Sequence, residues 1–238
     1  MRLNKFLAHS GIASRRKCDD LIESGKVTIN GAIVRNYSYQ VKIEDIIICN
    51  GIIINKIPKR RVYLLNKLSG YISTSKDPHK RKLVIDLIPS NDRLFTIGRL
   101  DRNTTGAILV TNDGELANML MHPRNCIERI YIAATKDDIP NNKRKLLLQK
   151  GIVSKGITYR GKIVRLGRNG NVVLWKVVLY EGKNHEVKHI FKALGTAVIH
   201  LHRQSFANLH VDNIDPGKYR KLRPNEIKQL FNSRKVNI

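Results

Sequence analysis

Acidic residues are scarce in this sequence, and long apolar runs are absent. The 238 residues include 19 Asp and Glu against 44 Lys and Arg, which gives a formal net charge of +25 at pH 7. So large a positive excess indicates a polyanionic partner, and nucleic acid is the leading candidate. No apolar run is long enough to span a membrane, and no basic amphipathic helix indicates binding to a membrane surface. We therefore expect no membrane association.

Cysteine is equally rare. Three cysteines, Cys18, Cys49 and Cys126, lie far apart in the chain. A scattered, odd-numbered set argues against a disulfide framework or a cysteine-rich zinc site and is typical of a cytoplasmic protein. The acid-free stretch 1–17 also has the composition of an organelle transit peptide, but it is better interpreted as the first helices of a folded module.

The first 57 residues have the pattern of a small α/β module. Apolar residues at helical spacing predict a helix over 2–10 and a second helix after Ser14, whose side chain would cap it. Asn-Gly pairs at 30–31 and 50–51 then predict two β-hairpins.

This module resembles the S4 RNA-binding domain in three segments that occur in order: RLNKFLA at 2–8, ASRR at 13–16 and GKVTING at 25–31. In that family two helices and the following loop present basic residues to structured RNA. Without this resemblance, a run of charged residues on a helix is most simply interpreted as a face exposed to solvent. The resemblance implies that six residues contact phosphate here: Arg2, Lys5, Arg15, Arg16, Lys17 and Lys26.

A polar, proline-containing stretch at 55–61 predicts a boundary, so we expect one domain over 1–57 and a second over 62–231. In the second, short β-rich runs alternate with helical segments. We expect strands at 62–66, 94–97, 106–111, 172–180 and 197–202, and helices at 115–121 and 184–194. This order predicts an α+β fold with a mixed, largely antiparallel sheet flanked by helices.

The segment TIGRLDRNTTGAILVTNDG holds the first candidate for chemistry. Asp101 lies on a polar loop between two strands, with Arg99 and Arg102 on either side. Loops held between strands commonly carry reactive side chains, and nearby cations would keep the carboxylate ionised, as a nucleophile requires. From the spacing alone, an aspartate that caps a turn and pairs with a local arginine is the simpler interpretation.

The segment HEVKH at 185–189 fits the zinc-protease pattern H-E-x-x-H. Its context does not fit a metal site. His185 would lie in the first turn of its helix behind polar residues, Lys188 would place a cation beside the metal, and no third ligand follows on a helix. We expect no metal here.

Motifs over nearly the whole chain are similar, in order, to those of the pseudouridine synthases that modify ribosomal RNA and carry an N-terminal S4 domain. They are GRLDxxTxG at 98–106, TNDGELAN at 111–118, ERxY at 128–131 and EGxNxEVK at 181–188. Together with KDP at 76–78, the last two resemble the large-subunit branch most closely. The H-E-x-x-H match is thereby explained as a variant of the final motif.

The resemblance implies an isomerase that converts uridine to pseudouridine in large-subunit ribosomal RNA, with small-subunit RNA as the alternative substrate. Asp101 matches the catalytic aspartate, Tyr131 an aromatic residue that lies against the target base, and Lys188 a basic residue that pairs with the aspartate. Arg99 and Arg102 would contact RNA. No cofactor or metal is implied, because uridine supplies both leaving group and nucleophile. We expect a cytoplasmic monomer whose partner is ribosomal RNA or a pre-ribosomal subunit.

The chain departs from the family pattern at several positions. Leu68 replaces a usual proline, His185, Lys188 and His189 replace usual arginines, and Ala207 replaces a common glycine. A lysine offers the aspartate a single point charge where arginine offers a bidentate pair. A non-catalytic ribosome assembly factor that only grips RNA is the alternative function, but binding alone would not need a carboxylate among basic groups.

Overall fold

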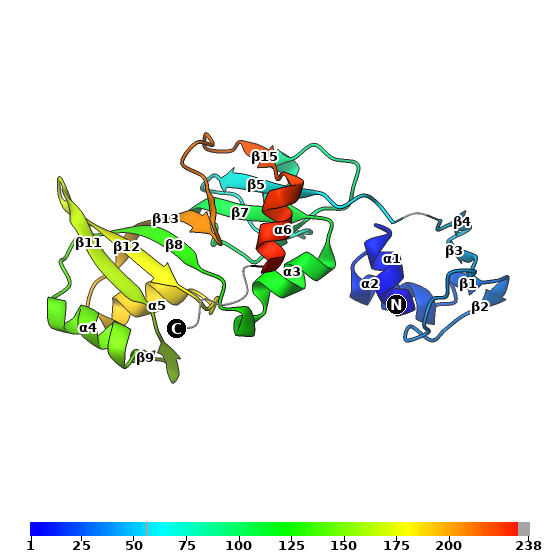
Figure 1. Cartoon of the computed structure of the whole chain (residues 1–238), viewed down its shortest axis with the longest axis horizontal. Coiled ribbons are helices and arrows are strands. Elements are labelled where there is room, and N and C mark those ends of the chain that lie inside the picture. The colour runs from blue at the N-terminus through cyan, green and yellow to red at the C-terminus, as the bar shows by residue number, and fades with distance from the viewer. Residues whose placement is uncertain (56, 233–238) are drawn as a thin grey trace. The chain divides into compact units, whose positions relative to one another are not determined.

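The computed structural model describes residues 1–55 and 57–232 (Figure 1). They divide into two compact units. The first holds Met1–Arg61 with the short stretches Ser90–Leu94 and Asn112–Gly114, and the second holds the other described residues. Among the described residues, no helix combines the length and apolar character needed to cross a membrane.

The first unit contains two helices and a four-stranded antiparallel sheet of order β2-β1-β3-β4. Its elements are α1 (Leu3–His9), α2 (Arg15–Glu23), β1 (Val27–Ile29), β2 (Ala32–Ile33), β3 (Ile47–Cys49) and β4 (Ile52–Ile53). Ser14 caps α2 as predicted, because its side chain accepts a hydrogen bond of 3.3 Å from the backbone N–H of Lys17.

Both Asn-Gly pairs form the predicted hairpin turns. Asn30 and Gly31 have φ values of 52° and 84°, and Asn50 and Gly51 have values of 50° and 78°. Asparagine and glycine tolerate this left-handed conformation, which the tight two-residue turn requires. The turns fold the sheet onto the apolar faces of α1 and α2, where Leu3, Leu7, Cys18 and Ile22 are fully buried.

The second unit is built on a nine-stranded mixed sheet (Figure 1). The main path runs β11-β12-β8-β13-β7-β5-β15, with β14 paired to β13 and β6 paired to β7. The pair β13–β7 is parallel and the other pairs are antiparallel, which confirms the predicted sheet. The strands are β5 (Val62–Lys67), β6 (Phe95–Ile97), β7 (Thr105–Thr111), β8 (Arg129–Thr135), β11 (Lys162–Asn169), β12 (Val172–Leu179), β13 (Val198–Phe206), β14 (Leu209–His210) and β15 (Tyr219–Lys221).

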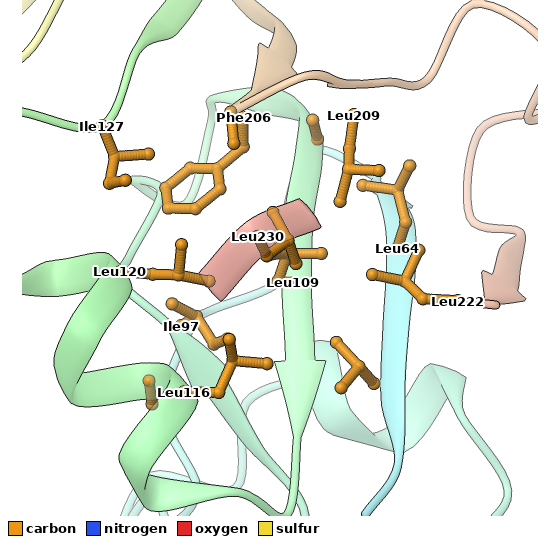
Figure 2. Packing of buried hydrophobic residues seen from close by; sticks show 14 of the residues in the cluster. Leu64, Ile97, Leu109, Leu116, Leu120, Ile127, Phe206, Leu209, Leu222 and Leu230 are labelled. Carbon is orange, nitrogen blue, oxygen red and sulfur yellow. The ribbon is translucent and has the colours of Figure 1, made fainter. Parts of the chain in front are cut away.

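Two helices pack on the β5–β7 part of this sheet, α3 (Gly114–Met121) and α6 (Pro224–Asn232). Figure 2 shows Leu116 and Leu120 of α3 and Leu230 of α6 directed toward Leu109 of β7 and Leu64 of β5. All five side chains are at most 2% exposed. Burial of a leucine side chain contributes about 1.5–3 kcal/mol, so this core fixes the strands that lead into and out of the site.

Two further helices pack at the other end of the sheet: α4 (Asn141–Gln149) contacts β11, and α5 (Glu186–Ala193) contacts β13 and the strand β9. The side chain of Trp175 on β12 is fully buried, with Phe191 of α5 edge-on at 6.4 Å between ring centroids. The remaining elements are η1 (Val84–Leu87), η2 (Pro123–Asn125) and the hairpin β9 (Ile152–Ser154) and β10 (Ile157–Tyr159).

The expected helix at 115–121 is confirmed, whereas the one at 184–194 begins two residues late. His185 has a left-handed φ of 49° and precedes the helix instead of lying in its first turn. Ala207 also has a left-handed φ, of 52°, which explains why glycine is common at this position in the resembling family. Neither α4 nor the β9–β10 hairpin was predicted.

Candidate active site

A cavity of about 800 Å³ opens in the second unit. Its lining comes from the loop before β7, from β8 and β13, and from the segment that enters α5. The cavity brings together all three residues predicted to be catalytic, Asp101, Tyr131 and Lys188. They come from parts of the chain that are distant in sequence, so the sheet assembles them.

The loop that carries Asp101 closes over a buried cation, Lys67. The Lys67 ammonium donates to the backbone carbonyls of Leu68 at 2.9 Å, Asp101 at 3.1 Å, Arg102 at 3.1 Å and Thr104 at 2.8 Å. Burial lowers the pKa of Lys67 to about 8. With its side chain fully buried, Lys67 ties the end of β5 to the second half of this loop, from Asp101 to Thr104.

The Asp101 carboxylate receives two donors on one oxygen. His185 Nδ1 lies 3.0 Å from Oδ2, and Lys188 Nζ lies 2.5 Å from the same atom. Among the described residues, no hydrogen bond reaches Oδ1 of Asp101. Partial burial raises the pKa of Asp101, but the hydrogen bonds from Lys188 and His185 outweigh it and hold the pKa below its usual range. Asp101 is therefore an ionised carboxylate whose Oδ1 accepts no hydrogen bond from the part of the chain that the structure describes.

One donor to Asp101, Lys188, is the residue that the resemblance implies, whereas the other, His185, was not expected. The loop neighbours Arg99 and Arg102 were expected to keep it ionised, but the hydrogen-bonding donors come from the start of α5, 84 and 87 residues further along the chain. Arg99 is exposed and lines the cavity, whereas Arg102 is exposed outside the lining.

Tyr131 stands on β8 beside a buried arginine. Arg203 on β13 is 2% exposed, and its guanidinium carbon lies 6.0 Å from the centre of the Tyr131 ring. Arg203 Nε donates to the carbonyl of Ala107 at 2.6 Å, which anchors the guanidinium to β7. Arg129, two residues before Tyr131, donates to the carbonyls of Ile127 and Glu181. The wall behind the tyrosine is thus cationic and rigid.

Glu186 is the buried acid of this region. Burial raises its pKa to about 7, and the nearby Glu181 contributes in the same direction. Its Oε2 accepts a hydrogen bond of 3.3 Å from the backbone N–H of Lys183, which closes the turn before α5. This carboxyl is a structural acid at the helix start, and it titrates close to neutral pH.

Sequence reasoning missed two residues of the site, His185 and Lys67. His185 was weighed only as a metal ligand, together with His189 four residues further on. Lys67 ends a strand whose six residues are all buried. A lysine inside such an apolar run is a signal for a buried cation that must find several acceptors.

Of the six basic residues predicted to contact RNA in the first unit, five lie exposed on the surface. Lys5 is half-buried. Lys17 also lies 3.4 Å from the carboxylate of Asp20 on the same helix. Their role in RNA binding stays a prediction.

Comparison with known proteins agrees with this architecture. Residues 61–193 match the RNA pseudouridylate synthase family and residues 1–47 match the S4 domain. The chain is 38% identical over 234 residues to ribosomal large subunit pseudouridine synthase B of Bacillus subtilis (strain 168), covering 96% of this chain and 95% of that protein. An uncharacterized RNA pseudouridine synthase of Aquifex aeolicus (strain VF5) is 35% identical, with coverage of 97% and 94%.

A solved crystal structure of a pseudouridylate synthase is also similar over nearly its whole length. The TM-score is 0.69 at 28% sequence identity, covering 97% of this chain and 99% of that one. Two family matches in the expected order, relatives that align from end to end and a shared fold lead to one conclusion. The chain belongs to the RNA pseudouridine synthases, a family of isomerases, and carries an S4 domain at its N-terminus.

Proposed function

We propose that this protein converts uridine to pseudouridine in large-subunit ribosomal RNA, with Asp101 as the nucleophile. The substrate follows the name of the Bacillus subtilis relative, which is 38% identical over nearly all of both chains. The net charge of +25 suits a ribosomal RNA partner. Small-subunit RNA is the alternative substrate.

The observation that carries the proposal is the asymmetric pairing of Asp101. Because Lys188 and His185 both bind Oδ2, Oδ1 is the oxygen left to act on the ribose. Oδ1 attacks C1′ or assists departure of uracil, and the N1–C1′ bond breaks. The freed base rotates and C5 bonds to C1′, while any Oδ1–C1′ bond formed in the first step breaks and restores the Asp101 carboxylate. The C5 proton leaves to solvent, and N1 gains a proton. The overall reaction is an isomerisation.

The other residues of the cavity have supporting roles in this scheme. Tyr131 lies against the target base, and Lys188 orients the Asp101 carboxylate. Arg99 and Arg102 contact the RNA around the target. The target uridine must leave its stack, which costs a few kcal/mol. The cationic surface offsets that cost through phosphate contacts.

We assign RNA binding to residues 1–57 and catalysis to residues 62–231. The basic residues of the first unit contact phosphate, which adds affinity without reading sequence.

Asp101→Asn tests the proposed function directly. The variant should lose pseudouridine formation and keep its RNA affinity, because the amide preserves shape and hydrogen bonding but cannot attack C1′. Release of tritium from C5-labelled uridine in ribosomal transcripts, under single-turnover conditions, measures the rate, and filter binding measures affinity. Lys188→Ala should slow the reaction without abolishing it. A rate for Asp101→Asn within about tenfold of the unchanged protein would refute the assignment.

A further inference from the structure

Arg203 is a buried cation in the lining of the cavity, and one of its donors is unsatisfied. The side chain is 2% exposed, and its Nη2 is buried without a hydrogen-bond partner in the part of the chain that the structure describes. We propose that the Arg203 guanidinium stabilises the negative charge that the uracil ring acquires when its N1–C1′ bond breaks. The inference rests on the proposed conversion of uridine to pseudouridine and names the group that supports the departing base.

The reaction creates this charge on the base for a limited time. When the N1–C1′ bond breaks, the electron pair stays with uracil, where N1 and the two carbonyl oxygens share it. Asp101 acts on the ribose carbon and does nothing for the base. The charge is consumed when C5 bonds to C1′. A group that stabilises it therefore lowers the barrier without binding the unreacted uridine more tightly.

The fold holds the guanidinium of Arg203 in one place. Its Nε donates to the carbonyl of Ala107 at 2.6 Å, which ties it to β7. Its guanidinium carbon lies 5.0 Å from the centre of the Phe206 ring and 6.0 Å from that of the Tyr131 ring. Because Tyr131 lies against the target base in the proposed function, the guanidinium is next to the place where the base reacts. A charge fixed in advance needs no rearrangement when the bond breaks.

A second buried guanidinium adds to the positive potential of this wall. Arg129 on β8 also lines the cavity, and its guanidinium carbon lies 5.2 Å from the centre of the Phe206 ring. Burial, together with the charge of Arg203, lowers the pKa of Arg129. Glu186 is the acid whose charge acts on Arg129, and burial raises its own pKa to about 7. At neutral pH this carboxyl is therefore only about half ionised and does not cancel the two cations.

The unsatisfied Nη2 of Arg203 indicates the kind of group that belongs beside it. A buried donor without an acceptor is costly, and folded proteins leave few of them. Uracil brings carbonyl oxygens into the cavity, and these oxygens gain negative charge as the base departs. A hydrogen bond between an ionised donor and an anionic oxygen is about twice as strong as one between neutral groups. The bond therefore strengthens as the reaction proceeds.

Two substitutions and two substrates test the charge of Arg203. Arg203→Gln keeps a hydrogen-bond donor and removes the charge, and Arg203→Lys keeps the charge without the planar fork. The substrates are large-subunit ribosomal transcripts that contain either uridine or 5-fluorouridine. Fluorine at C5 withdraws electrons and stabilises the uracil anion, so departure of the base needs less help from the protein. The measurement is the single-turnover rate at which the isomerised nucleoside forms, followed by chromatography of nuclease digests.

Arg203→Gln should slow the reaction of uridine by about 100-fold or more, as expected for loss of a fixed donor to a developing anion. With 5-fluorouridine the same variant should lose only about tenfold or less, and Arg203→Lys should fall between Arg203→Gln and the unchanged protein on uridine. RNA affinity by filter binding should stay within about twofold for both variants, because the charge is absent before the bond breaks.

Lys176→Gln is the matched control, because it removes a cation from the same sheet outside the cavity lining. Lys176 on β12 is half-buried and lies in register with Ile132, the neighbour of Tyr131. Successive side chains of a strand point to opposite faces, so Lys176 is directed away from the face that carries Tyr131. This variant should react at the unchanged rate with both substrates.

Equal rate losses on uridine and 5-fluorouridine would overturn the inference, since a merely structural arginine would not distinguish the two leaving groups. A full rate for Arg203→Gln on uridine would overturn it too. If circular dichroism shows that Arg203→Gln is unfolded, Arg203→Lys decides, and its loss must be larger on uridine.

Asp101→Asn in the same assay separates this inference from the proposed function. If Asp101→Asn keeps its rate while the Arg203 variants distinguish the substrates, the nucleophile assignment fails and the role of Arg203 stands. If Asp101→Asn is inactive while the Arg203 variants lose equally on both substrates, the inference about Arg203 alone fails.

Discussion

Gly106 and Arg203 lie opposite each other in the parallel pair β7–β13, so close that a Cβ on Gly106 would be 2.8 Å from the Arg203 carbonyl carbon and nearer still to its oxygen. Gly106 also has a φ of +102°, which side-chain-bearing residues rarely adopt. These strands carry the Asp101 loop on one side and the arginine behind Tyr131 on the other. A glycine at 106 is thus a condition for assembling the site.

Gly106→Ala should lower the free energy of unfolding by about 3 kcal/mol or more, because backbone atoms must move apart. Gly156→Ala is the control, since Gly156 has a φ of +73° but no atom within 4 Å of its Cβ position. That variant should lose only about 1–2 kcal/mol from backbone strain. Urea unfolding followed by the fluorescence of Trp175 measures both. Equal losses in the two variants would contradict the close-approach argument.

Lys67→Met should destabilise the protein by about 3 kcal/mol and also reduce turnover. The substitution leaves four buried or half-buried carbonyl oxygens without their shared donor, and the loop of Asp101 loses its anchor. Lys162→Met, at an exposed position of β11, should change stability by no more than about 0.5 kcal/mol. Denaturant titration and single-turnover tritium release test the two effects. Full turnover by a folded Lys67→Met protein would show that the loop holds its shape without the lysine.

Glu186→Gln should remove a pH dependence of stability. In the folded protein burial raises the pKa of Glu186 to about 7, from an ordinary value of 4.5. Unfolding between these two pH values releases a proton, so stability falls as pH rises from about 4.5 to about 7, by up to about 3 kcal/mol. Glutamine has no proton to release. The difference in unfolding free energy, variant minus unchanged protein, should therefore be larger at pH 8 than at pH 4. Thermal unfolding of both proteins at pH 4 and pH 8 measures this difference. Glu44→Gln, at an exposed position, is the control and should show no such change.

Replacing Arg15, Arg16 and Lys17 together by glutamine should weaken ribosomal RNA binding and flatten its salt dependence. Each lost phosphate contact should reduce the slope of log affinity against log salt by about 0.7–0.9. The three side chains are exposed on α2, so helix content by circular dichroism should not change. An unchanged salt slope would remove this face of the helix from the RNA interface.

Local chemistry made much of the fold predictable. The Ser14 cap, the two Asn-Gly turns and the apolar run that became β5 each depend on neighbours within a few residues. The helix α4 escaped prediction because it begins after Pro140 without a side-chain cap and buries only Leu147. Its packing partners, and not its own pattern, make it a helix.

The donors to Asp101 could not be derived from spacing. Which segment faces the Asp101 loop depends on the register of β7 against β13, and no local rule encodes a contact over 84 residues. For the same reason the flanking Arg99 was expected to neutralise Asp101. His185 was not considered as a partner of Asp101. Lys188 was placed beside Asp101 only through the family resemblance.

The pairing of β7 with β13 also has a consequence for synthesis on the ribosome. It joins Thr105 and Gly106 to His202 and Arg203, so the centre of the sheet cannot close until most of the chain has emerged. Contacts of such long sequence separation form slowly, whereas the helices and hairpins of the first unit depend mostly on local contacts. A nascent chain should therefore hold a folded first unit well before Asp101 meets its donors, so the two units fold one after the other during synthesis.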